Sequence, residues 1–224
     1  MTLKIKTILF IILTFIEFSI NAQNKYISIG NSFNGFCIGS PHHYNGVRVN
    51  FLDENITKFN GLSISGFLDI QKLNGLSIGL FGGDIANSNG IVINGLYSGG
   101  THNGISITGL WSNTELVNGI SISCLNAGQK YNGVSIGLWT IYANEKINGI
   151  AVGGFFVHSK QMNGLALSLL HNDFECQRGV SISIFNKTKE LHGFQFGLIN
   201  YAGNNRKIFK WIPLINFNLK KASI

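Results

Sequence analysis

Side chains that could carry acid–base or metal chemistry are few among the 224 residues, and their spacing does not bring them together. His42 and His43 are the only adjacent histidines, but neighbouring side chains on a strand point to opposite faces, so the pair indicates a polar loop rather than a metal site. Asp53 and Glu54 diverge in the same way and are a poor acid–base pair. The other histidines share no position in the repeat: His102, His158, His171 and His192. The sequence therefore predicts no enzyme, no cofactor and no metal site.

Cysteine and glycine usage adds no further chemistry. Cys37, Cys124 and Cys176 are odd in number and irregularly spaced, so they indicate small apolar substitutes rather than a disulfide framework. Glycine is abundant, with 28 copies, but no glycine segment is followed by Lys-Ser or Lys-Thr at the spacing of a phosphate-binding loop. The glycines must have a structural purpose instead.

That purpose is a repeat in which an Asn-Gly pair precedes alternating apolar and small residues, as in "NGISITGLW" from Asn103 and "NGVSIGLW" from Asn132. From Asn60 onward the copies follow one another at 14 to 16 residues. A fixed period over most of a chain is the signature of a repeat architecture. The glycine recurs twelve times, at Gly35, Gly46, Gly61, Gly75, Gly90, Gly104, Gly119, Gly133, Gly149, Gly164, Gly179 and Gly193. Asparagine precedes it in ten copies, and Arg178 and His192 precede it in the last two.

The copies have apolar residues two and four positions after the asparagine, usually a further one seven positions after it, and often one immediately before it, with a small residue often at the sixth position. The alternation predicts a short strand with one apolar face, and the small residue predicts a bend. The intervening stretch, such as "SNTELV" before Asn118, is polar and predicts a turn. We expect the four apolar positions to fill a narrow interior.

A parallel β-solenoid of about twelve coils of 14 to 15 residues, with a C-terminal cap, accounts best for this pattern. In a solenoid, identical residues stack about 4.8 Å apart. Stacked asparagines can pass amide hydrogen bonds from coil to coil, and glycine supplies the positive φ that a corner requires. The predicted structural corners are Asn60–Gly61, Asn74–Gly75, Asn89–Gly90, Asn103–Gly104, Asn118–Gly119, Asn132–Gly133, Asn148–Gly149 and Asn163–Gly164.

The alternative is an antiparallel outer-membrane β-barrel with one strand per copy and a transport or anchoring role. Strands of nine to eleven residues with short turns would also give this period. However, a barrel offers no reason for Asn-Gly to recur at the same place in strands that run in opposite directions. The seventh-position Leu and Phe residues would also face a lumen that is normally polar.

Segments outside the regular repeat have their own composition. Residues 1–23 combine Lys4 and Lys6, an apolar run and Ala22, which predicts a cleaved secretory signal peptide and an exported protein. Residues 24–60 hold irregular first coils, residues 61–205 the regular repeats, and residues 206–224 an aromatic cap.

The formal net charge of +7 suggests nucleic-acid binding until the charges are located. Five of the basic residues fall in the last nineteen positions, at Arg206, Lys207, Lys210, Lys220 and Lys221, and the repeat region is close to neutral. A basic stripe with interleaved aromatics is absent, so nucleic acid is not an expected partner. The basic tail could instead touch anionic lipid or lipopolysaccharide.

Aromatic residues near the bend are further candidates for ligand contact. Tyr97, Trp111 and Phe156 lie eight residues after their asparagine, and Trp139 lies seven after. They could pack in the bend, or form a platform for a sugar or a protein.

The phrases "NGLSIGLF" and "NGVSIGLW" resemble the coils of trimeric autotransporter adhesin heads. They are closer to a bacterial family of secreted surface-repeat proteins with NG-x-x-(I/L)-G-L phrases and a Trp-Pro-containing tail, here "KWIPLINFNL". The resemblance implies a cell-surface or outer-membrane location without an assigned activity. It leads us to expect a non-enzymatic structural or binding scaffold, with adhesion as one role, an unidentified protein or glycan ligand, and no stated oligomeric state.

Overall fold

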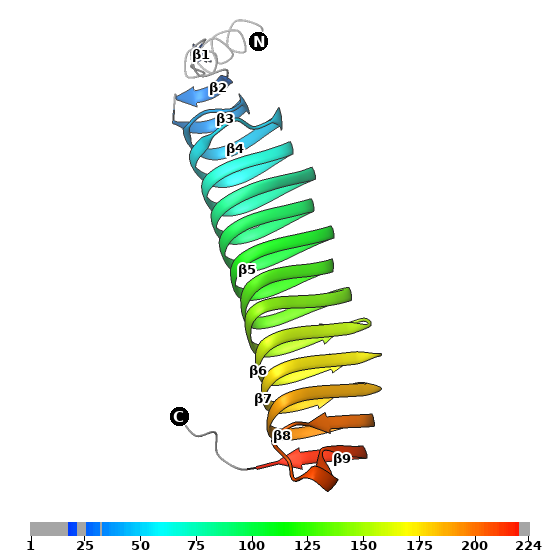
Figure 1. The fold of residues 1–224 in the computed structure, drawn as a ribbon. Coiled ribbons are helices and arrows are strands. Elements are labelled where there is room, and N and C mark those ends of the chain that lie inside the picture. Colours follow the sequence, from blue (N-terminus) through cyan, green and yellow to red (C-terminus); the bar gives the residue numbers. More distant parts are fainter. Residues whose placement is uncertain (1–17, 22–25, 32, 220–224) are drawn as a thin grey trace, which may run out of the picture. The chain divides into compact units, whose positions relative to one another are not determined.

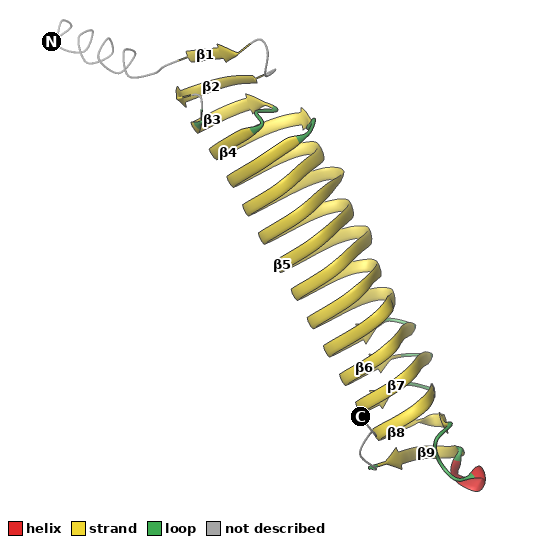
Figure 2. Ribbon diagram, turned by 60° about the vertical axis from the view of Figure 1, so that its left-hand side comes forward, coloured by secondary structure: helices red, strands yellow, loops and turns green. Residues whose placement is uncertain are grey.

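A computed structural model describes residues 18–21, 26–31 and 33–219. The chain divides into two compact units, Met1–Asn94 and Gly95–Ile224, and β5 (Ile56–Gly153) contributes to both. Figures 1 and 2 show a structure built almost wholly from strands. Most of the predicted signal peptide lies outside the described residues, apart from residues 18–21.

The first unit begins with antiparallel pairing and then becomes a parallel stack (Figure 1). The edge strand β1 pairs antiparallel with β2, and β2 pairs antiparallel with β3. From β3 onward the pairing is parallel, with Asn34 opposite Asn45 and Asn45 opposite Asn60. The strands before β5 are β1 (Phe18–Asn21), β2 (Tyr26–Asn31), β3 (Asn34–Gly39) and β4 (His43–Leu52).

The second unit continues with parallel coils and ends in an antiparallel strand. Figure 2 shows the single helical turn η1 beside that last strand. Parallel pairing joins the end of β5 to β6, β6 to β7 and β7 to β8, whereas β8 pairs antiparallel with β9. The elements after β5 are β6 (Phe156–Ser168), β7 (His171–Ile182), β8 (Phe185–Ala202), η1 (Lys207–Phe209) and β9 (Trp211–Asn218).

The predicted fold class is confirmed, because the chain forms a parallel β-solenoid of about 11 turns. The barrel alternative is wrong, since a barrel of the predicted kind needs antiparallel neighbours and the repeats pair in parallel and in register. The repeat period is therefore one coil, and the Asn-Gly pair returns to the same place in each coil.

The glycine of the pair is required by how closely the coils approach. Gly119 has a φ of 136°, and a Cβ added there would lie 2.1 Å from the carbonyl oxygen of Gly104. Gly61 in the first unit is equivalent, with φ 128° and a distance of 2.0 Å to the oxygen of Gly46. An L side chain fits neither the conformation nor the space, so only glycine lets the chain bend here without breaking the backbone ladder.

The asparagines form side-chain ladders along each unit. In the second unit, the Asn118 amide donates to Asn103 Oδ1 and the Asn132 amide donates to Asn118 Oδ1, both at 2.8 Å. The ladder continues through Asn148 to Asn163, at 2.8 and 2.7 Å. In the first unit the same donation runs through Asn34, Asn45, Asn60, Asn74 and Asn89. Each inner asparagine therefore donates to the coil before it and accepts from the coil after it.

The interior differs from the prediction in which residues fill it. The apolar residue before the asparagine is buried as expected, as at Phe59, Val117 and Met162. The apolar residues two, four and seven positions after the asparagine do not line the interior; the small residues three and five positions after it do, as Ser121 and Ser123 show.

The small inward residues face a wall of larger ones. The core of the second unit contains Ile141, Val157 and Phe174 from the return part of the coils, together with Ala151 and Ala166 from the opposite wall. Close-packed interiors tolerate little excess volume. A coil of only 14 to 16 residues has room for large side chains on one wall only if the other wall carries Ser or Ala. The branched residues that alternate with these Ser and Ala residues therefore face outward.

Each coil has a second corner, which lies six and seven positions after the asparagine. The strands are interrupted there, between β5 and β6 at residues 154–155 and between β6 and β7 at residues 169–170. Backbone hydrogen bonds still join successive corners: the Phe155 amide donates to the Trp139 carbonyl at 2.8 Å, and the Leu170 amide donates to the Phe155 carbonyl at 3.0 Å. Corner side chains consequently stack in columns as well.

We predict that Asn118→Ala destabilises the protein more than Asn163→Ala. Asn118 takes part in two ladder bonds, and its loss leaves a donor on one side and an acceptor on the other. Asn163 donates the last Asn–Asn bond of the ladder. At about 1 kcal/mol for each hydrogen bond, we expect a loss of about 2 kcal/mol for Asn118→Ala and about half of that for Asn163→Ala, measured by denaturant unfolding. Equal losses would contradict a ladder with additive rungs.

Candidate functional site

The main candidate for contact with a partner is an apolar stripe, which we define in the second unit as positions two to seven after each repeat asparagine or its replacement. The stripe consists of residues 105–110, 120–125, 134–139, 150–155, 165–170, 180–185 and 194–199, and none of these segments contains Asp, Glu, Lys or Arg. Its outward residues include Leu138, which is 66% exposed, and Leu198, which is 61% exposed. Exposed uncharged surface that continues over many coils marks an interaction site.

The first unit carries the same kind of surface. At its corners the Phe51, Phe67 and Phe81 rings form a cluster, with 5.3 Å between the stacked centroids of Phe67 and Phe81. Phe81 is nevertheless about half exposed, and Phe51 is about two thirds exposed. The cluster therefore orders the rings against each other without removing them from solvent.

The four aromatic residues predicted as a ligand platform do not form one surface. Tyr97 is buried and packs edge-on against His102 at 6.2 Å, so it does not face a ligand. Trp111 and Trp139 are exposed, and Trp139 lies 4.7 Å from Phe155 in the corner column. Phe156 lies on the return strand, in register with Thr140 rather than with Trp139.

The C-terminal cap combines apolar surface with basic groups. A hollow of about 720 Å³ is lined by apolar Phe209, Ile212, Ile215, Phe217 and Leu219, with Arg206 and three asparagines at its margin. Around it, Ile208 and Leu214 are largely exposed. This hollow has the composition of a site for an amphiphile with an anionic head group.

A buried ion pair occupies the interior of the first unit. Arg48 makes two bonds to the Asp53 carboxylate, at 2.6 and 2.8 Å, and a third to Ser63 Oγ at 2.6 Å. Both charged side chains are fully buried, and the guanidinium carbon lies 4.9 Å from the centre of the Phe59 ring. The two terminal nitrogens of Arg48 are hydrogen-bonded, its buried Nε has no hydrogen-bond partner, and the pair has no exposed face. We therefore assign the pair to stability rather than to catalysis.

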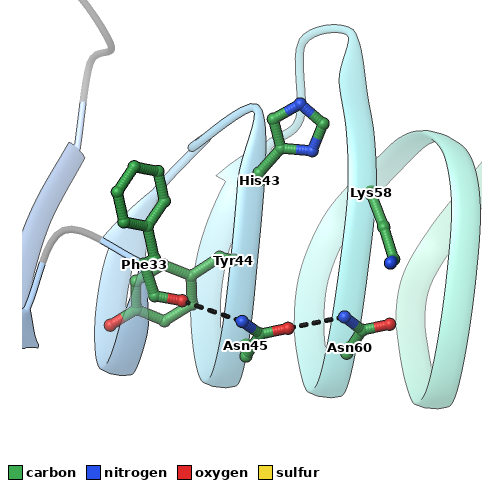
Figure 3. A pocket seen from close by; sticks show the side chains of 6 residues that line it. All are labelled: Phe33, His43, Tyr44, Asn45, Lys58 and Asn60. Carbon is green, nitrogen blue, oxygen red and sulfur yellow. Dashed lines mark hydrogen bonds between the residues drawn. The ribbon is translucent and has the colours of Figure 1, made fainter.

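The adjacent His42 and His43, considered as metal ligands, have different surroundings. His42 Nδ1 lies 3.2 Å from the Asn55 carbonyl oxygen. His43 borders a small hollow of about 200 Å³ with Lys58, Tyr44 and the start of the asparagine ladder (Figure 3). The charged or titratable nitrogens at the hollow are the His43 imidazole and the Lys58 ammonium group, beside the side-chain amides of Asn45 and Asn60. No carboxylate lines the hollow, so it does not offer a carboxylate–histidine pair for acid–base chemistry.

A different set of ligand atoms converges in the second unit. Cys176, Glu190 and His192 each offer one atom, and these atoms lie within 4.8 Å of one another. This cluster was not predicted, because Cys176 resembled a small apolar substitute and His192 a tolerated change in the repeat. The sequence signal that could have indicated it is the replacement of the repeat asparagine by Arg178 and His192 in two adjacent coils.

A second, buried asparagine ladder near the C-terminal end was not predicted either. Asn172 donates to Asn186 Oδ1 at 3.0 Å, and Asn186 donates to Asn200 Oδ1 at 2.9 Å. In the other coils this position holds residues of many types, including Asp53 and Asn126. That variation hid the pattern in the sequence.

No protein-family model matches the chain, and neither the curated proteins nor the solved structures contain a significant match. Among the residues that the structure describes, none of the helical segments has the length and apolar character needed to cross a bilayer.

We predict that Asp53→Asn lowers the free energy of unfolding by about 3–5 kcal/mol, because it leaves the buried Arg48 guanidinium without its counter-charge. The neighbouring Glu54→Gln removes the same charge from an exposed side chain and should change stability by less than about 0.5 kcal/mol. Denaturant unfolding of both variants measures the difference. Similar effects of the two substitutions would contradict the buried pair.

We further predict that Cys37 resists alkylation in the folded protein. Burial raises the pKa of its thiol to about 11, although Arg48 acts in the opposite direction. Only the thiolate reacts, so at pH 8 roughly one Cys37 in a thousand would be reactive even if reagent could reach it. Iodoacetamide labelling followed by mass spectrometry should modify Cys124 before Cys37, since Cys124 is partly exposed. Rapid labelling of Cys37 before unfolding would show that the prediction is wrong.

Proposed function

We propose that this protein is a non-enzymatic, exported repeat scaffold that lies at the cell surface or outer membrane and contacts lipid through its apolar stripe. The proposal rests on one observation: branched and aromatic residues face outward in all seven uncharged segments of the stripe. The fold itself is compatible with a structural or binding scaffold.

The chemistry of the stripe favours acyl chains over a glycan. Its columns are formed mainly by Ile, Leu and Val, as at Ile136 and Ile150, and the Ser residues between them point inward. Sugar recognition needs convergent hydrogen-bonding groups beside an aromatic platform. The stripe offers the aromatic rings of Trp139 and Phe155 at a corner, but few polar groups next to them.

Charge favours an anionic lipid surface over a second copy of the chain. The cap places Arg206, Lys207 and Lys210 beside exposed Trp211 and Leu214. Basic side chains next to exposed Trp, Phe and Leu are typical of segments that lie in a lipid interface. Two copies that met at their caps would bring like charges together, whereas anionic head groups would neutralise them.

The proposal predicts that Leu138→Glu and Trp139→Glu each weaken binding to phosphatidylethanolamine/phosphatidylglycerol vesicles. Both side chains are more than half exposed in the corner column. Transfer of such a side chain into lipid contributes about 1.5–3 kcal/mol, so each variant should lose about tenfold or more in partitioning. Co-flotation of the purified protein with the vesicles measures this change.

Tyr142→Glu is the matched control, because Tyr142 is 45% exposed on the return strand, outside the stripe. It should bind vesicles like the unchanged protein. Equal losses in all three variants would contradict a role for the stripe. A protein that ignores vesicles and forms a discrete dimer by light scattering would assign the stripe to a second copy instead.

A further inference from the structure

The asparagine ladder of the second unit ends in a block of four residues that departs from the repeat. Up to Asn163 the ladder position is Asn, and the position two residues before it is Lys130, Lys146 or Gln161 in the preceding coils. In the next two coils these positions are held by Cys176 with Arg178, and by Glu190 with His192. Three of these four replacements are residues that ligate metals.

The register brings the replacements together. Cys176 on β7 pairs with Glu190 on β8, and Arg178 pairs with His192 in the same two strands. Because alternate residues of a strand share a face, Glu190 and His192 lie on the side that Cys176 also occupies. His192 Nε2 is 4.0 Å from Glu190 Oε2, and the three candidate ligand atoms all lie within 4.8 Å of one another.

We propose that Cys176, Glu190 and His192 form a zinc-binding site that joins the last two coils where the asparagine ladder stops. A thiolate, an imidazole and a carboxylate are the ligand types that Zn²⁺ takes. Zinc-to-ligand distances of about 2.0–2.3 Å at tetrahedral angles place ligand atoms roughly 3.3–3.8 Å apart. The three atoms therefore have to approach one another by about 1 Å at most to bind the ion, and Glu190 is an exposed side chain that can rotate.

The surroundings suit a divalent cation with one open position. A hollow of about 300 Å³, lined by Lys160, Gln161, Glu175, Cys176, Lys189 and Glu190, gives access from solvent. Within it Lys189 is already paired with Glu175 at 2.8 Å. Zn²⁺ bound to one thiolate and one carboxylate is neutral overall, so the positive charge of Arg178 does not oppose it strongly. Three protein ligands leave the fourth position to water.

Co²⁺ titration of the purified protein tests the site, because thiolate-bound Co²⁺ shows a charge-transfer absorption in the near ultraviolet. We expect this absorption to saturate at one equivalent and to disappear when Zn²⁺ is added. Cys176→Ser should abolish it. His192→Asn should weaken Co²⁺ binding at least tenfold while restoring the residue that the other coils carry, so the variant is expected to fold.

Cys124→Ser is the matched control, since Cys124 is also a free and partly exposed cysteine but does not belong to the cluster found among the described residues. It should keep the full absorption. Zn²⁺ should also raise the melting temperature of the unchanged protein but not that of His192→Asn, because a ligand stabilises only the state that binds it. Absence of the charge-transfer absorption in the unchanged protein, or its persistence in Cys176→Ser, would overturn the proposal. Neither readout depends on the proposed lipid contact.

Discussion

The structure depends on one constraint, the in-register stacking of very short coils. Parallel neighbours about 4.8 Å apart place each residue over its equivalent in the previous coil. A residue type that suits one coil therefore has to suit the whole column. The Gly119 column shows the strictest form of this rule, because a Cβ there would meet the oxygen of Gly104 at 2.1 Å.

Two consequences follow from the short coil. Its interior is narrow, so Ser and Ala line one wall while larger residues such as Ile141 and Phe174 line the other. The branched residues between the small ones are consequently turned to solvent, where they form the apolar stripe. The same geometry that stabilises the coil thus creates the surface to which we assign lipid contact. The polar ladders complete each coil, and the ladder of the second unit gives way to the Cys176 cluster only where asparagine is lost.

Periodicity was sufficient to predict the coil, because the Asn-Gly spacing is a property of the backbone and survives in every copy. Alternation alone could not predict which residues point into the coil, since apolar and small residues alternate identically whichever set points inward. The usual preference for buried apolar residues selected Leu62 and Ile64 for the interior, whereas the volume of the coil selects Ser63 and Ser65. Tyr97 was misplaced for a related reason: its spacing resembles that of Trp111, but it packs inside.

The site residues were hardest to predict, because they depend on which coils lie side by side. Cys176 and Glu190 are fourteen positions apart in the sequence and become neighbours only through the parallel register of β7 and β8. The Arg48–Asp53 pair was hidden similarly, since Asp53 was considered with adjacent Glu54 rather than with its partner inside the coil.

Single cysteines placed in turn at residues 134, 135, 136, 138 and 139, in a background without Cys124 and Cys176, would test most directly which residues of the stripe face outward. Thiol-labelling rates with and without anionic vesicles are the measurement. Our account predicts fast labelling at 134, 136, 138 and 139, slow labelling at 135, and protection of the fast positions by vesicles. Fast labelling at 135 with protection at 134 and 136 in the absence of lipid would contradict it.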